Sequence, residues 1–138
     1  ACIVHETFNL QKLLELKLAH PKAKIIAHPE CDENILAEAD YIGSTSKLLE
    51  YSRDNSANEF IVLTESGIIH QMQKASPHKT FIEGPNNEGC ACNECPYMRL
   101  NTLEKLLKCM QEQSPAIEIE ESLRQQALVP LNRMLELS

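Results

Sequence analysis

Short apolar runs alternate with helix-like segments along most of the chain, and this alternation restricts the fold more than any other feature. The apolar runs lie at residues 2–4, 23–27, 41–43, 60–63 and 80–82. Helical spacing or helix-capping residues separate them, at residues 10–19, 35–39, 47–52 and 67–75. Continuous apolar runs are typical of parallel strands that are covered on both faces. The pattern therefore predicts an α/β fold, with a three-layer αβα arrangement around a short parallel sheet.

Polar residues predict where several helices begin. Asn9 is placed to cap the helix at residues 10–19, and Asp32 or Asn34 to cap the next one. Ser46 is the natural cap of the helix that follows the third apolar run.

The last part of the chain is predicted to be largely helical. Leucine and methionine recur at three- and four-residue steps in residues 100–113, which predicts an amphipathic helix. Residues 121–137 also predict a helix, in which Pro130 starts a new helix or kinks the old one. Between them, Ile117 and Ile119 indicate a short strand.

Reactive or hydrogen-bonding side chains follow the predicted strands. They are His5-Glu6, His28-Glu30, Ser44-Thr45-Ser46 and Thr64-Glu65-Ser66, followed by the cysteine-rich stretch 90–95. Because ligands gather at the carboxyl ends of parallel strands, these side chains are expected around one rim.

Two of these groups have both a functional and a plain interpretation. His28 and Glu30 pair an imidazole with a carboxylate, which suits acid–base chemistry, but a loop histidine beside a solvated glutamate is equally compatible. Residues 44–46 suit a bound phosphate or carboxylate, but simple helix capping is the commoner role of such a triplet.

Three of the six cysteines, Cys90, Cys92 and Cys95, fall within six positions. Thiolates are soft ligands for zinc and for iron–sulfur clusters, and C-x-x-C spacing lets two sulfurs reach one metal centre. Pro96 after the last cysteine is similar to the ending of some ferredoxin motifs. A disulfide or unused reduced thiols are the alternatives. Cys2, which stands at C-x-x-H spacing from His5, is open to either packing or ligation.

Composition narrows the class of function. A formal charge of −7 argues against partners such as nucleic acid or an anionic membrane surface. No apolar run approaches the ~20 residues that span a bilayer. No secretory pattern is present, so a reducing cytoplasmic location is expected, where thiols bind metals more often than they cross-link. The apolar start at Ala1, without methionine, indicates the tail of a longer polypeptide.

Several motifs together resemble one family, the quinolinate synthases of NAD biosynthesis. They occur in the family's order and span the chain, at residues 1–6, 27–30, 39–40, 43–46, 67–68, 72–73, 92–98 and 127–134. The resemblance implies an enzyme of three pseudo-symmetric α/β domains around a [4Fe–4S] cluster held by one cysteine per domain. That transferase condenses iminoaspartate with dihydroxyacetone phosphate to quinolinate, with loss of phosphate and water.

The resemblance also assigns positions in this chain. Residues 1–84 would form the end of the second family domain and most of the third, and residues 85–138 a cysteine loop and C-terminal helices that complete it. Cys2 and Cys95 would be two cluster ligands, whereas Cys90 and Cys92 would not.

The catalytic pair would be His28 and Glu30, and His28, Pro29, Glu30 and Thr45 would contact substrate. The partners implied are the N-terminal remainder of the enzyme, without which this chain is expected to be inactive. An L-aspartate oxidase or aspartate dehydrogenase would supply the substrate upstream.

Two other functions stay open at this point. One is a small zinc-binding module that uses Cys92, Cys95, Cys2 and His5. The other is a metal-free α/β interaction domain with reduced cysteines.

Overall fold

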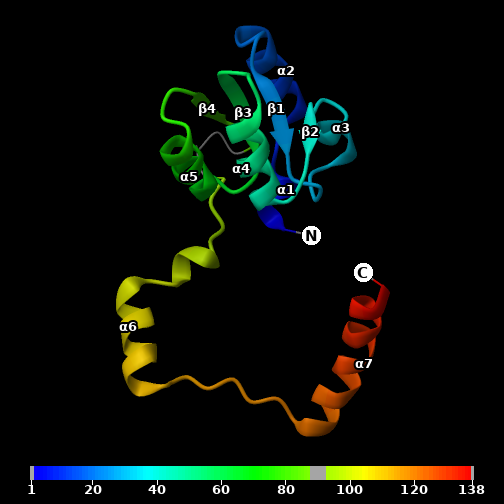
Figure 1. The fold of residues 1–138 in the computed structure, drawn as a ribbon, viewed down its shortest axis with the longest axis vertical. Helices are drawn as coiled ribbons and strands as arrows, with labels where there is room; N and C mark the ends of the chain where they lie inside the picture. Colours follow the sequence, from blue (N-terminus) through cyan, green and yellow to red (C-terminus); the bar gives the residue numbers. More distant parts are fainter. Residues whose placement is uncertain (1, 88–92, 138) are drawn as a thin grey trace. The chain divides into compact units, whose positions relative to one another are not determined.

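The computed structural model describes residues 2–87 and 93–137, and its contacts divide the chain into a unit at residues 1–100 and a unit at residues 101–138. In the first unit the elements are α1 (Ile3–Glu6), α2 (Leu10–Ala19), β1 (Lys24–Ala27), α3 (Glu33–Leu36), β2 (Tyr41–Ile42), α4 (Thr45–Asp54), β3 (Glu59–Leu63), α5 (Gly67–Ala75), β4 (Thr80–Glu83) and the 3₁₀ turn η1 (Met98–Leu100) (Figure 1). The predicted division at residues 84 and 85 stays a prediction.

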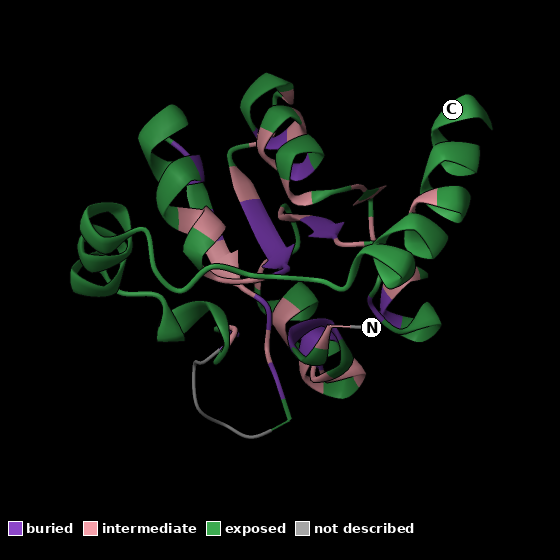
Figure 2. Cartoon of the chain, turned by 90° about the horizontal axis from the view of Figure 1, so that it is seen from below, coloured by how far each residue is buried: buried purple, intermediate pink, exposed green. Residues whose placement is uncertain are grey.

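The four strands form one parallel sheet in the order β2-β1-β3-β4. Successive side chains of a strand point to opposite faces, and two separate cores follow from this. Ile25 and Ile61 point into one core, with α2 and α3 over them; Ile26 and Val62 point into the other, under α4 and α5. Figure 2 shows the buried strands between helices whose outer faces are exposed. This confirms the predicted three-layer αβα arrangement.

Most predicted elements occur where the sequence pattern placed them. Asn9 caps α2 by accepting a hydrogen bond from the Lys12 N–H, and Asp32 caps α3 in the same way from Asn34. The predicted start of α4 is two residues late, because the helix begins at Thr45 and its N-cap is Ser44.

The predicted first strand is wrong. Residues 2–4 lead into the single helical turn α1, in which Ile3 is 51% exposed and Val4 is 3% exposed. A three-residue apolar run is too short for periodicity to separate strand from helix. Among the described residues, the sheet has four strands, and none of them pairs with this run.

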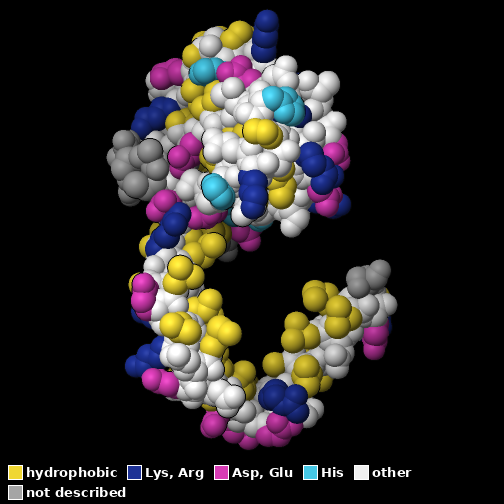
Figure 3. All heavy atoms as spheres, turned by 60° about the vertical axis from the view of Figure 1, so that its left-hand side comes forward, with side chains coloured by type: hydrophobic (Ala, Val, Ile, Leu, Met, Phe, Trp, Pro, Cys, Tyr) yellow, Lys and Arg dark blue, Asp and Glu magenta, His cyan; other side chains and the backbone are white. Residues whose placement is uncertain are grey.

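The second unit contains α6 (Leu103–Glu112) and α7 (Glu121–Leu137). Thr102 caps α6, and Pro130 lies inside α7 without ending it. The strand predicted around Ile117 is absent from the described residues, and Ile117 itself is 91% exposed. An isolated strand cannot satisfy its backbone groups without a neighbour. Hydrophobic side chains cover parts of both helices, as Figure 3 shows. No described helix combines the length and apolarity needed to cross a membrane.

Candidate functional site

His5 is the centre of a compact polar network at the carboxyl ends of β1 and β3. Its ring is buried, and Nδ1 lies 3.0 Å from Glu30 Oε2 while Nε2 lies 3.1 Å from Thr64 Oγ1. Glu30 follows β1 closely and Thr64 directly follows β3. An ionised carboxylate only accepts, so Nδ1–H donates to Glu30, and Nε2 accepts from the Thr64 hydroxyl. Both ring nitrogens of His5 are therefore fixed by neighbours.

Local backbone geometry explains how His5 reaches this position. Cys2 is the N-cap of α1, and its carbonyl accepts a hydrogen bond from the His5 N–H at 2.9 Å. At the other end of the turn, the Thr7 hydroxyl donates to the Val4 carbonyl at 2.9 Å. The turn therefore carries Val4 and His5 inward together, and Cys2 stands immediately before them.

His28 lies flat against His5. The two rings are stacked with centroids 4.1 Å apart and planes 9° from parallel. The Glu30 N–H donates to His28 Nδ1 at 3.3 Å, which leaves the proton of the neutral ring on Nε2. Burial, and then the neighbouring His5, lower the pKa of His28, although Glu30 opposes this. The lowered pKa favours the neutral imidazole of His28.

Glu30 is held in its charged form. The hydrogen bond from His5 is the main cause that lowers the pKa of this carboxyl. Its side chain is 48% exposed, so one side of the carboxylate faces solvent while the other contacts His5. An ionised carboxylate and a neutral imidazole on one rim are groups that can accept and relay protons.

Cys2, His5 and Glu30 also form a possible metal-ligand set. One sulfur, nitrogen or oxygen atom from each of these residues lies within 4.8 Å of the corresponding atoms of the other two. The sequence pattern had placed His5 and Glu30 on one rim, but it did not indicate that Cys2, His5 and Glu30 would form one ligand set.

Cys95 stands two residues after an anchor on the same rim. Asn93 is 1% exposed; its carbonyl accepts from the Ser66 N–H at 3.0 Å, and its Nδ2 donates to the Gly84 carbonyl at 2.6 Å. Ser66 follows β3 and Gly84 follows β4, so Asn93 ties the cysteine segment to the edge that carries His5. Sequence reasoning missed Asn93, whose only signal was an amide between two cysteines.

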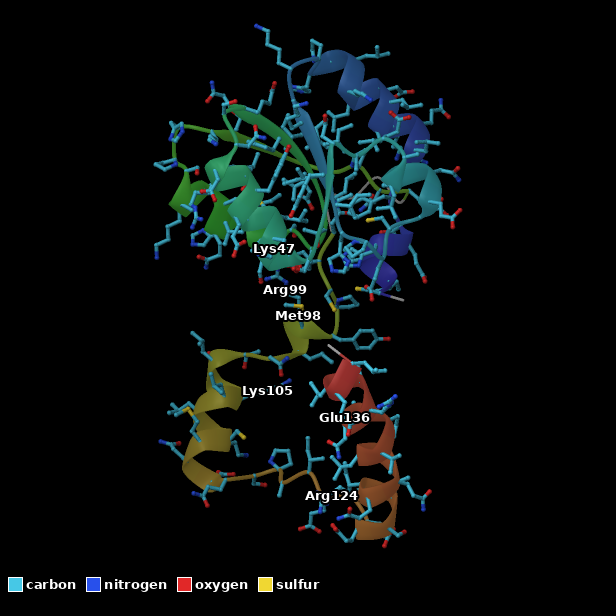
Figure 4. The ribbon with its side chains drawn as sticks, turned by 45° about the vertical axis from the view of Figure 1, so that its right-hand side comes forward. Lys47, Met98, Arg99, Lys105, Arg124 and Glu136 are labelled. Atoms are coloured by element: carbon cyan, nitrogen blue, oxygen red, sulfur yellow. The ribbon has the colours of Figure 1, made fainter. Side chains whose placement is uncertain are left out.

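A second set of contacts holds the other side of this segment. The Arg99 N–H donates to the Cys95 carbonyl at 3.2 Å. The guanidinium of Arg99, labelled in Figure 4, lies 2.7 Å from Glu94 and 3.7 Å from Glu65. The backbone around Cys95 is therefore held on one side by Asn93 and on the other by Arg99. The Cys95 thiol is not in a disulfide, and the residue is partly exposed.

Thr45 lies near the same rim through a different strand. It is the first residue of α4, directly after β2 and Gly43, whose N–H donates to the Ala27 carbonyl at 3.1 Å. Ser44, the N-cap, makes no side-chain hydrogen bond to the first turn. The N–H groups of this helix start are consequently available to an anion.

The remaining cysteines do not join the site in the described part of the chain. Cys31 is buried, donates from Sγ to the Leu63 carbonyl at 3.6 Å, and burial raises its pKa to about 11. Cys109 is exposed on α6. Both fit the interpretation as packing or incidental thiols. Cys90 and Cys92 lie outside the described residues.

Comparison with known proteins identifies the family of this chain. Residues 1–136 match the family model of the quinolinate synthetase A protein. A quinolinate synthase from Microcystis aeruginosa is 63% identical over 138 residues, covering 100% of this chain and 43% of the relative. One from Prochlorococcus marinus (strain MIT 9303) is 60% identical over 136 residues, covering 99% of this chain and 41% of the relative. One from Synechocystis is 60% identical over 138 residues, covering 100% and 43%.

This chain spans somewhat less than half of the length of these relatives. The range that the family model matches includes the His5 network and Cys95. The chain belongs to the quinolinate synthetase A family.

Proposed function

We propose that this chain is the C-terminal part of a cytoplasmic quinolinate synthase that condenses iminoaspartate with dihydroxyacetone phosphate at a [4Fe–4S] cluster. The observation that carries the proposal is that the residues next to Cys2 and next to Cys95 are bound at the same edge of the sheet, which we call the common rim. The turn after Cys2 is bound to Thr64, and Asn93 near Cys95 is bound to Ser66, only two residues along the chain from Thr64. Cys2 and Cys95, far apart in sequence, therefore each lie a few residues from a side chain or carbonyl that is bound at the end of β3.

The donor set fits such a cluster. Cys2 and Cys95 are free thiols, both partly exposed, and thiolates are the usual protein ligands of iron–sulfur clusters. These two residues would hold two irons, and the third cysteine would come from the N-terminal remainder of the enzyme. With three ligands from protein, the bound cluster supplies a Lewis-acidic iron open to substrate.

His28 and Glu30 would perform the proton transfers. Glu30 begins as a carboxylate that faces solvent on one side, so it can accept a proton from substrate. His28 carries its proton on Nε2 because Nδ1 accepts from the Glu30 N–H, so it can donate a hydrogen bond to a substrate oxygen. Pro29 joins the two and faces solvent.

Thr45 would bind the negatively charged end of a substrate. The uncapped N–H groups at the start of α4 and the Thr45 hydroxyl together suit a phosphate or carboxylate. An aspartate oxidase or aspartate dehydrogenase would supply the unstable imine upstream.

The test uses the complete enzyme, prepared without oxygen. Cys2→Ser and Cys95→Ser should each lose iron, acid-labile sulfide, the brown absorbance and activity, while Cys109→Ser keeps all four. Glu30→Gln should keep the cluster and lose activity by about 10²–10⁴-fold, as expected for a lost general base. An unchanged iron and sulfide content in Cys95→Ser would refute the ligand assignment.

A further inference from the structure

We propose that Cys2, His5 and Glu30 form a second kind of metal site, which binds one zinc-type divalent ion when no iron–sulfur cluster is present. This goes beyond the proposed function and does not require it. The site lies in the first unit alone and uses one nitrogen, one sulfur and one oxygen atom.

The distances between the three ligand atoms suit zinc. Tetrahedral bonds of about 2.0–2.3 Å place the ligand atoms roughly 3.3–3.6 Å from one another. In this chain the three atoms already lie within 4.8 Å of one another, and His5 Nδ1 lies 3.0 Å from Glu30 Oε2. Binding would bring these atoms closer together, to the spacing of a tetrahedral site.

Thr64 provides the support that a metal-bound histidine needs. A ligating imidazole usually donates its other N–H to a fixed acceptor, which sets the ring's orientation. Thr64 is 1% exposed and its Oγ1 lies 3.1 Å from His5 Nε2. A hydroxyl both donates and accepts, so Thr64 can serve His5 whether the ring proton is on Nδ1, as without metal, or on Nε2, as with metal. The stacked ring of His28 holds the plane of His5 in either state.

Charge and exposure also favour one ion with an open position. The Cys2 thiolate and the Glu30 carboxylate would neutralise a divalent charge, and the thiol proton would leave to solvent on binding. Glu30 is 48% exposed at its side chain, so water can occupy the fourth position.

The consequence is competition for Cys2. The same thiol would serve the cluster in the proposed enzyme and the single ion in this site. A chain loaded with zinc would then be unable to accept the cluster until the ion is removed.

The test uses residues 1–138 in reducing, metal-free buffer, with Co²⁺ as the spectroscopic probe and Zn²⁺ as the competitor. The background variant has Cys90, Cys92 and Cys95 all changed to Ser, which removes the cysteine segment as a rival site. We expect this variant to bind one Co²⁺ with a thiolate-to-cobalt absorption band and tetrahedral visible bands, and Zn²⁺ to displace it.

Further substitutions in that background separate this site from adventitious binding. Cys2→Ser should abolish the thiolate band, and Glu30→Gln should weaken Co²⁺ binding at least tenfold. Thr64→Val, close in shape, should weaken it about 10–100-fold, because the supporting hydrogen bond is lost. Cys109→Ser is the matched control and should bind as the background does. Circular dichroism checks that each variant is folded.

Two results would overturn the proposal. One is the absence of a thiolate band in the background variant, with binding seen only when the cysteine segment is intact. The other is Co²⁺ binding that persists unchanged in Glu30→Gln and Thr64→Val. Neither result bears on the cluster, because the background variant lacks Cys95.

Discussion

Replacing Asn93 with alanine should destabilise the first unit more than any exposed substitution. The Asn93 amide donates to the Gly84 carbonyl at 2.6 Å and accepts from Asn86 Nδ2 at 3.2 Å. Asn93 is 1% exposed and Asn86 is 8% exposed, so water cannot readily replace either bond. Leaving a buried polar group without a partner costs about 1–3 kcal/mol. Two such groups give an expected loss of roughly 2–6 kcal/mol.

Urea unfolding measures this loss directly. The chain has no tryptophan, and the stacked pair Tyr41–Tyr51 lies in the first unit, so tyrosine fluorescence follows that unit. Asn101→Ala, at an exposed position outside the named helices, is the control and should change the unfolding free energy by less than about 0.5 kcal/mol. Asn93→Asp keeps an acceptor for Asn86 but turns an oxygen toward the Gly84 carbonyl, so it should be at least as unstable as the alanine variant. If Asn93→Ala matches Asn101→Ala, the amide does not anchor the Cys95 segment and the argument for the common rim fails.

Three smaller predictions follow from other parts of the chain. Iodoacetamide at pH 8 should modify Cys109 well before Cys31, because Cys31 is buried and its pKa is raised to about 11; equal rates would contradict this. The folded state favours the neutral form of His28, because its pKa is lower in the folded chain than in the unfolded chain. The stability due to this group is therefore present above its unfolded pKa near 6.5 and is lost as pH falls through the lower folded pKa. His28→Asn should flatten that part of a curve of unfolding free energy against pH. Asn9→Ala should cost about 1 kcal/mol by removing the cap bond to the Lys12 N–H, as thermal unfolding can show.

The sheet was predictable because its signal is redundant. Four apolar runs of parallel-strand type each lie beside helices with recognisable caps, and a mistake in one boundary does not alter the layers. Residues 2–4 lacked that redundancy. The conformation of these residues depends on His5, which is hydrogen-bonded to Glu30 and Thr64. Both partners are distant in sequence, so these bonds produce no periodic pattern of residues.

The sequence predicted several residues of the candidate site but not the contacts between them. Strand-end positions selected His28, Glu30 and Thr45, because the carboxyl ends of parallel strands share one edge. The stacking of His28 on His5 and the anchoring by Asn93 are contacts between loops. Loop conformation depends on packing that spacing rules do not describe, so no motif could have indicated them.

The hydrogen bonds around Glu30 separate the roles of the two proposed catalytic groups. In the neutral state of His28, Nδ1 accepts from the Glu30 N–H, and Nε2 carries the proton that can be donated to substrate. A second proton on His28 would break the hydrogen bond from the Glu30 N–H to Nδ1, and burial opposes the positive charge that would result. Glu30 has a free oxygen toward solvent and is already ionised. In the proposed enzyme, Glu30 would therefore use its exposed oxygen to accept the substrate proton, and His28 would orient the substrate by donating a hydrogen bond from Nε2.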